Sequence, residues 1–327
     1  MKWSDNLRTL GNGVKLATRI AKAKLDGPRV QPPLLARPSR LVEYDGFGGN
    51  PGRLRMRMHL PPSAANRPLV VLLHGCGQDA AGFAADSGWI DCADRLGFPL
   101  LLPEQAGSNN AGRCFQWFQP SDTTRDSGEA GSIAGMTRAA IGRFGSDRGR
   151  VFVVGLSAGG AMAVALLAAY PDLFAAGACV AGLPVGAATS GLQAIMRMAS
   201  AGPDQSPEDW AAHVRAAAPA GFGGAWPRLS VWQGLMDKTV APANAALLAM
   251  QWRELHGLAA PAKAEQIRDG VAHQMWPDGR HCQVELWSLP DMPHGYPVGS
   301  RPAMPGHFIE AAPVDATAGI ARFFGLD

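Results

Sequence analysis

The chain has 327 residues, of which 47% are hydrophobic and 17% charged, so its composition excludes a disordered or fibrous protein and favours one large domain around a sizeable core. The net charge is +3, but residues 1–30 hold seven Lys and Arg against two Asp, so the remainder is slightly acidic and gives no support to nucleic-acid binding. No run approaches the roughly 18 apolar residues of a membrane span, and five scattered cysteines do not suit a disulfide-rich scaffold.

The N-terminal segment, residues 1–38, differs in pattern from the rest of the chain. Between residues 3 and 25, apolar side chains recur every third or fourth position among basic ones, which predicts an amphipathic helix. Pro28, Pro32, Pro33 and Pro38 predict an extended linker after it. Docking of this helix on its own domain, on a polymer granule and on a membrane surface are all compatible with the pattern.

Residues 53–60 alternate strictly between polar and apolar side chains, which is typical of a strand with one buried face. A second short strand pattern, residues 41–44, precedes it across a glycine-rich stretch. The two together predict an antiparallel hairpin at the edge of a sheet.

The next strand patterns are apolar on both faces, as in a parallel sheet that helices cover on both sides. They lie at residues 69–73, 99–102, 151–154, 175–180 and 229–232. Helical patterns lie between them at residues 84–96, 133–144 and 161–170, followed by a last strand at 284–289 and a closing helix at 315–324. This alternation predicts one α/β domain over residues 39–327 with a mostly parallel, doubly wound sheet.

Residues 183–227 lose this regular alternation and are rich in glycine, alanine and proline. Short helical patterns remain near residues 192–198 and 207–217. The segment lies where a small cap over the site is expected.

A serine flanked by glycines, in the run Gly155-Leu156-Ser157-Ala158-Gly159, follows one predicted strand and opens one predicted helix. A serine hydroxyl becomes a useful nucleophile when a sharp turn exposes it beside a base, and small neighbours permit that strained turn. The motif and its setting predict a nucleophilic Ser157 in an α/β-hydrolase fold.

In this fold class an acid and then a histidine follow the serine along the chain. His294 lies in a loop between the last predicted strand and the closing helix, whereas His281 precedes that strand and therefore lies at the opposite end of the sheet. Asp237 follows the preceding strand pattern, and Asp291, three residues before His294, is its rival. We predict a triad of Ser157, Asp237 and His294.

Acyl transfer also needs backbone N–H donors aimed at the oxyanion. Ala158, directly after the serine, supplies one, and Cys76, in the loop after the first apolar strand, supplies the other. His74 in that loop then has a structural role. The histidines and cysteine between residues 273 and 282 match no common metal site, so neither a metal nor another cofactor is expected.

Taken together, these residues resemble the polyhydroxybutyrate depolymerase family of esterases. Separate motifs match in one order between about residues 66 and 240, and more loosely as far as His294. The matching stretches are HGCGQ (74–78), LPEQ (102–105), RCFQWF (113–118), GLSAGG (155–160), YPDLFAA (170–176), GLP (182–184) and GLMD (234–237).

The resemblance implies the same triad and the same two oxyanion donors. It also implies a bridge between Cys76 and Cys114, because the corresponding cysteines of the family are often bridged. Two reduced thiols in a cytosolic protein are the alternative.

Substrate contacts are implied for Trp117, Gln78 and Tyr296. Departures from the family pattern gather around the expected pocket: Gln233 stands where a histidine is frequent, Met292-Pro293 replace a more glycine-like approach to the histidine, and Tyr296 stands where tryptophan is common. These departures leave the triad intact and put the substrate in question.

The resemblance implies a serine esterase that acts through an acyl-enzyme on Ser157, on short-chain hydroxyalkanoate polymers or oligomers. No threonine-rich linker or polymer-binding domain follows the closing helix, which favours oligomeric or amorphous polyester and smaller esters. Feruloyl or acetylxylan esters of the plant cell wall are the first alternative, and a non-catalytic protein bound to a granule or membrane is the second. The family is typically exported, but the N-terminus lacks a recognisable Sec signal, so extracellular and cytoplasmic locations both stay open.

Overall fold

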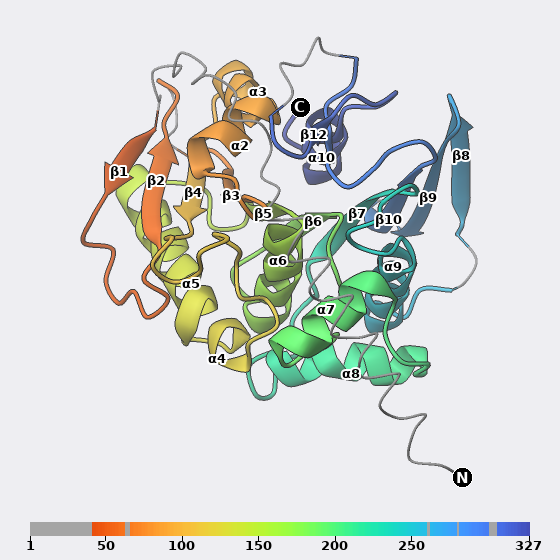
Figure 1. Cartoon of the computed structure of the whole chain (residues 1–327). Coiled ribbons are helices and arrows are strands. Elements are labelled where there is room, and N and C mark those ends of the chain that lie inside the picture. Colours follow the sequence, from red (N-terminus) through yellow and green to blue (C-terminus); the bar gives the residue numbers. More distant parts are fainter. Residues whose placement is uncertain (1–40, 63–65, 260–261, 280, 301–305) are drawn as a thin grey trace. The chain divides into compact units, whose positions relative to one another are not determined.

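Within the residues that the structure describes, a ten-stranded sheet forms the centre of the fold (Figure 1). The computed structural model describes residues 41–327 except 63–65, 260–261, 280 and 301–305, so the predicted helix and linker of residues 1–38 lie outside the described residues. The strands of this sheet are β1 (Val42–Tyr44), β2 (Arg55–His59), β3 (Leu69–Leu73), β4 (Leu100–Glu104), β5 (Val151–Leu156), β6 (Ala176–Val180), β7 (Arg228–Gly234), β8 (Ala264–Arg268), β9 (Val271–Asp278) and β10 (His281–Leu289).

The strands lie in the order β1-β2-β4-β3-β5-β6-β7-β10-β9-β8 across the sheet. From β4 to β10 neighbouring strands are parallel, and at both edges they are antiparallel. At the first edge, Val42 pairs with Met58 and Tyr44 with Met56. The prediction of a mostly parallel sheet with an antiparallel edge hairpin is therefore confirmed.

The central strands are buried on both faces because their apolar side chains alternate between two cores. In β3, Leu69 and Val71 pack into one core, while Val70 and Leu72 pack into the other. Helices α5, α6 and α9 contribute to the first core, and α2, α3 and α10 contribute to the second (Figure 1). Their bounds are α2 (Ala80–Asp86), α3 (Trp89–Leu96), α5 (Gly128–Phe144), α6 (Ala158–Ala169), α9 (Ala243–Leu255) and α10 (Ala316–Phe324).

Two local features differ from the sequence-based expectation. The helix expected over residues 84–96 is two helices, α2 and α3, because the chain turns at Gly88, where φ is 84°. The hairpin of β8 and β9 was not predicted, although Asp269 and Gly270 both have positive φ and such a dipeptide is a typical hairpin turn. In the sequence, polar residues on both of these strands hide the alternation of apolar and polar positions that predicts a strand.

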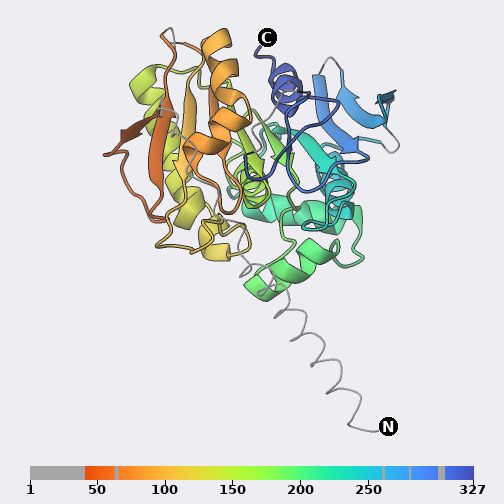
Figure 2. The same cartoon turned by 45° about the horizontal axis from the view of Figure 1, so that its top comes forward.

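The segment between residues 183 and 227 contains α7 (Gly191–Ala199) and α8 (Pro207–Ala217), close to the expected positions (Figure 2). In α8, Trp210 packs with Ala161 of α6 and Leu183 in a small third core. By contrast, α7 buries Ala194 alone and exposes large apolar side chains. The role of this segment as a cap remains a prediction.

Over the described ranges, no helix has both the length and the apolar character needed to cross a membrane.

Candidate active site

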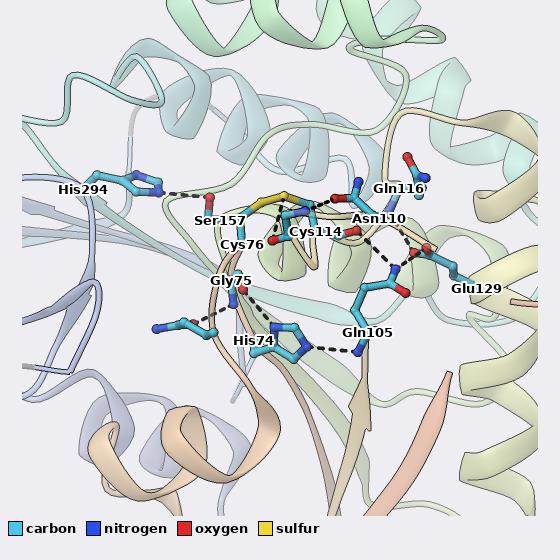
Figure 3. Close-up of a disulfide and its surroundings, with 12 residues drawn as sticks. His74, Gly75, Cys76, Gln105, Asn110, Cys114, Gln116, Glu129, Ser157 and His294 are labelled. Carbon is cyan, nitrogen blue, oxygen red and sulfur yellow. Dashed lines mark hydrogen bonds between the residues drawn. A yellow bond between two sulfur atoms is a disulfide. The ribbon is translucent and has the colours of Figure 1, made fainter. Parts of the chain in front are cut away.

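Loops at the carboxyl ends of parallel strands carry the predicted site residues. Ser157 follows β5, Asp237 follows β7, His294 follows β10, and Cys76 lies in the loop after β3, here called the β3 loop (residues 74–79). Because these strands run in the same direction, their carboxyl ends meet at one edge of the sheet. Figure 3 shows Ser157 between His294 on one side and Cys76 on the other.

Ser157 occupies a strained turn between β5 and α6, with φ of 56° and ψ of −117°. The turn is tight because neighbouring backbone segments almost touch it. A Cβ atom on Gly155 would lie 2.1 Å from the Gly159 carbonyl oxygen, and one on Gly159 would lie 2.3 Å from the Leu73 carbonyl oxygen. The glycines on either side of the serine are therefore steric requirements of this turn.

This crowding predicts that Gly155→Ala lowers the free energy of unfolding by about 2 kcal/mol or more, because the added methyl group must displace backbone. Gly142→Ala is the matched control, since Gly142 is exposed in α5 and a Cβ there meets nothing within 4 Å. We expect this control to gain about 0.5–1 kcal/mol from the better helix propensity of alanine. Urea unfolding, monitored by circular dichroism, measures the free energy of unfolding of both variants. Equal stability of the two variants contradicts the steric argument.

A continuous hydrogen-bond chain joins the three predicted triad residues. His294 Nε2 lies 3.0 Å from Ser157 Oγ, and His294 Nδ1 lies 2.7 Å from Asp237 Oδ2. All three residues are buried. With Nδ1 donating to the carboxylate, the neutral imidazole presents Nε2 as an acceptor toward the serine hydroxyl.

Asp237 is held as a carboxylate by several donors. Its Oδ1 accepts from the backbone N–H groups of Thr239 and Val240, each at 2.8 Å, and its Oδ2 accepts from Gln233 Nε2 at 3.0 Å as well as from His294. Burial opposes ionisation, but the bonds to His294 and to the two backbone groups outweigh it and keep the pKa of Asp237 below its usual value. Gln233, seen in the sequence as a departure from the family, is thus a partner of this carboxylate.

The loops that carry Asp237 and His294 are also joined through their backbones. Leu235 N–H donates to the Leu289 carbonyl oxygen at 2.9 Å, and Met236 N–H donates to the Met292 carbonyl oxygen at 3.0 Å. A Cβ on Gly234 would lie 2.3 Å from the same Met292 oxygen, so only glycine fits there. The rival acid Asp291 is exposed and makes no such contact with the histidine.

One residue beside the histidine was not anticipated from the sequence. The ring of Phe308 meets His294 edge-on, with centroids 5.3 Å apart. Phe308 lies next to the short strand β12 (Ile309–Glu310), which pairs with β11 (Tyr296–Pro297). No motif around Phe308 signals this position, because the contact depends on a strand pairing that its neighbours make.

A disulfide joins Cys76 in the β3 loop to Cys114 in the segment between β4 and α4 (Pro120–Thr123), here called the disulfide loop (residues 105–119) (Figure 3). Gly77 N–H also donates to the Gly112 carbonyl oxygen at 2.8 Å, so the two loops are linked by backbone as well. No hydrogen bond within the described chain occupies the backbone N–H groups of Cys76 and Ala158. Both are free to meet an oxyanion beside Ser157.

The three expected substrate contacts differ in position. Tyr296 is 0% exposed and its hydroxyl bonds Trp89 Nε1 and Thr317 Oγ1, each at 2.9 Å, so its side chain lies in the core, and its contact with substrate stays a prediction. Gln78 is also buried, and both ends of its amide are engaged by backbone, which makes it a brace of the β3 loop rather than a free contact. Trp117 is half-buried and packs against the small third core, which also contains Ala161, one helical turn after Ser157.

A backbone-strained serine that faces a buried histidine and carboxylate, on this strand order, is the arrangement that defines serine hydrolases of the α/β-hydrolase fold. A solved acetyl xylan esterase from Aspergillus awamori has the same fold, with a TM-score of 0.74 and 24% identity over 88% of this chain and 99% of that one. The Esterase PHB depolymerase family model matches residues 54–273. The chain belongs to this family and is a serine esterase, that is, a carboxylic ester hydrolase.

Curated relatives in the family act on different esters. The chain is 37% identical to poly(3-hydroxyalkanoate) depolymerase C of Paucimonas lemoignei, over 88% of this chain and 70% of that protein. It is 33% identical to an acetylxylan esterase of Coprinopsis cinerea, over 79% of this chain and 70% of that protein. It is 31% identical to feruloyl esterase B of Talaromyces stipitatus, over 75% of this chain and 69% of that protein. The family therefore leaves the acyl and alcohol parts of the substrate open.

Proposed function

We propose that this esterase hydrolyses short-chain hydroxyalkanoate esters, as oligomers or accessible polymer, through an acyl-enzyme on Ser157. The observation that carries the chemistry is the hydrogen-bond chain from Ser157 Oγ through His294 to Asp237, with links of 3.0 and 2.7 Å. The observation that supports the substrate class is the exposure of large apolar side chains on α7 and directly before Asp237.

In the first step His294 Nε2 accepts the Ser157 proton as the serine oxygen attacks the ester carbonyl. Asp237 keeps the histidine proton on Nδ1 and stabilises the imidazolium that forms. The backbone N–H groups of Cys76 and Ala158 donate to the oxyanion of the tetrahedral intermediate. His294 then gives its proton to the departing alcohol, and water, activated by the same histidine, hydrolyses the acyl-enzyme.

Aliphatic polyester is less polar than acetylated polysaccharide, and large apolar side chains are exposed on α7 and directly before Asp237. Leu192, Ile195 and Met196 of α7 are 55–72% exposed. Leu235 and Met236, which directly precede Asp237, are 46% and 54% exposed. Clustered exposed apolar side chains are a common mark of binding surfaces.

Plant-wall esters are the second candidate. Acetylxylan and feruloyl esterases are among the relatives, and a half-buried tryptophan such as Trp117 suits a sugar or aromatic ring as well as an aliphatic acyl chain. The identity with poly(3-hydroxyalkanoate) depolymerase C covers more of the chain, which supports the polyester candidate.

A side-by-side ester panel tests the substrate class. We expect kcat/KM for a hydroxybutyrate trimer to exceed that for methyl ferulate and acetylated xylan by about 10-fold or more, equivalent to roughly 1.4 kcal/mol of transition-state binding. Rates on p-nitrophenyl butyrate serve as the common reference for active enzyme. A preference for either plant-wall ester by the same margin contradicts the polyester assignment and leaves the esterase assignment intact.

A further inference from the structure

We propose that Glu129, a buried carboxylate at the start of α5, is a positioning residue for the Cys76 oxyanion donor. It touches no reacting atom and acts through the disulfide loop and the β3 loop. This inference rests on the proposed mechanism, in which the Cys76 N–H binds the oxyanion.

The Glu129 carboxylate holds the disulfide loop at two points. It is 2% exposed. Its Oε1 accepts from Gln105 Nε2 at 2.5 Å, and its Oε2 accepts from the Gln116 backbone N–H at 2.8 Å. Gln105 Nε2 also donates to the Cys114 carbonyl oxygen at 3.2 Å, so the two peptide groups that follow the Cys114 Cα atom are tied to the same carboxylate, one through Gln105 and one directly (Figure 3).

The same network continues into the β3 loop. Gln105 N–H donates to His74 Nε2 at 3.1 Å, which leaves the ring proton on Nδ1, and Nδ1 donates to the Gly75 carbonyl oxygen at 2.8 Å. The peptide that carries this carbonyl also contains the Cys76 N–H. The orientation of the oxyanion donor is thus connected to Glu129 by two routes, the disulfide and the chain through Gln105 and His74 (Figure 3).

Both carboxylate oxygens face N–H donors, so the network is complete only when Glu129 is ionised. A proton on either oxygen has no acceptor in front of it and displaces one of the two N–H groups. Glutamine at this position has the same defect, because its NH₂ group faces a donor. Glu129→Gln therefore imitates the protonated protein.

Protonation of Glu129 falls within the range of an ordinary activity assay. Burial raises the pKa of Glu129 to about 7, although the hydrogen bonds from Gln116 and Gln105 act in the opposite direction. Asp122 of α4 is the charged group that raises the pKa further, and its Oδ1 accepts from the Glu129 N–H at 3.2 Å. Burial lowers the pKa of His74, so this ring stays neutral.

The other element that packs on Glu129 adds no charge beside the carboxylate. Gly52, in the turn before β2, lies so close that a Cβ there would be 2.6 Å from the Glu129 Cα atom. Its N–H donates to Ser132 Oγ of α5. The ionisation of Glu129 is therefore governed by burial, its two amide partners and Asp122.

The test is the pH dependence of kcat for p-nitrophenyl butyrate, expressed as the ratio of wild type to Glu129→Gln. Ionisation of the catalytic base affects both proteins and cancels in the ratio. We expect a ratio of about 10 to 100 at high pH, falling toward one as pH drops through about 7, with KM changed less than about two-fold. In an Asp122→Asn background the midpoint of this fall should move to lower pH.

Glu285→Gln is the matched control, because Glu285 is equally buried and bonded by Ser230 and His273, but on β10 away from the β3 loop. Its ratio to wild type should not vary with pH. If Glu129→Gln does not fold, Gln105→Met replaces it. This change removes the amide link to Glu129 and should lower kcat at high pH, and the ratio of wild type to Gln105→Met should again fall as pH drops through about 7.

The outcomes separate the two proposals. A wild type without ester hydrolysis contradicts the proposed function. An active wild type whose ratio to folded Glu129→Gln is constant across pH overturns the positioning role alone, since a purely structural defect lowers activity equally at every pH.

Discussion

Ser157→Ala should lower kcat for p-nitrophenyl butyrate by at least about 10⁴-fold, because the nucleophile is lost and only binding and oxyanion stabilisation remain. The variant should remain folded. Alanine is no larger than serine, and the positive φ of this position strains both residues alike. The measurement is steady-state hydrolysis, with circular dichroism to verify the fold.

Fluorophosphonate labelling gives an independent readout of the same prediction. The reagent should modify wild type and the Ser121→Ala control, whose serine is exposed on α4, and should leave Ser157→Ala unlabelled. Labelling that persists in Ser157→Ala, or near-normal turnover by that folded variant, would show that another group is the nucleophile. Absence of labelling in the wild type would instead favour a non-catalytic binding protein.

Asp237→Asn should reduce kcat by about 10⁴-fold, because asparagine stabilises the tautomer of His294 that cannot accept the serine proton. The N–H groups of Thr239 and Val240 bind Oδ1, so they hold the carbonyl oxygen of asparagine there and leave its NH₂ group facing His294 Nδ1. Nδ1 then becomes the acceptor, and the ring proton moves to Nε2, where it blocks transfer from Ser157. KM should change little.

Asp291→Asn is the control, since the sequence left Asp291 as the rival acid and the structure leaves it exposed beside the same loop. Its kcat should stay within about two-fold of wild type, as for most surface substitutions. A loss below about 10-fold in Asp237→Asn, or a larger loss in Asp291→Asn than in Asp237→Asn, contradicts the assignment of the acid.

Much of the fold could be predicted because its signals are local. The apolar runs that became β3, β5, β6 and β7 are buried on both faces, and such runs have few alternatives to a covered parallel sheet. The β8–β9 hairpin was missed because its strands carry polar side chains, and its turn at Asp269 and Gly270 was the remaining signal. The break between α2 and α3 was missed because Gly88 lies inside a helical pattern.

The site shows the same division between local and long-range information. Ser157 was predictable because its turn needs glycines within two residues on each side, which the sequence displays directly. Gln233 was visible only as a departure from the family, and its bond to the Asp237 carboxylate emerged from the folded loop. Tyr296 was expected at the pocket, but its neighbours Trp89 and Thr317, distant in the sequence, draw its hydroxyl into the core.

The sequence by itself determined the fold class and predicted a nucleophile, a base and two candidate acids, because strand patterns, the glycine-flanked serine and the order of residues along the chain can all be read from short segments. The choice of Asp237 over Asp291 as the partner of His294 needed the tertiary structure. So did the connection of Glu129 to the Cys76 loop, which spans more than 50 positions. These features are hydrogen bonds between segments that only the packed sheet brings together, and no spacing along the chain encodes them.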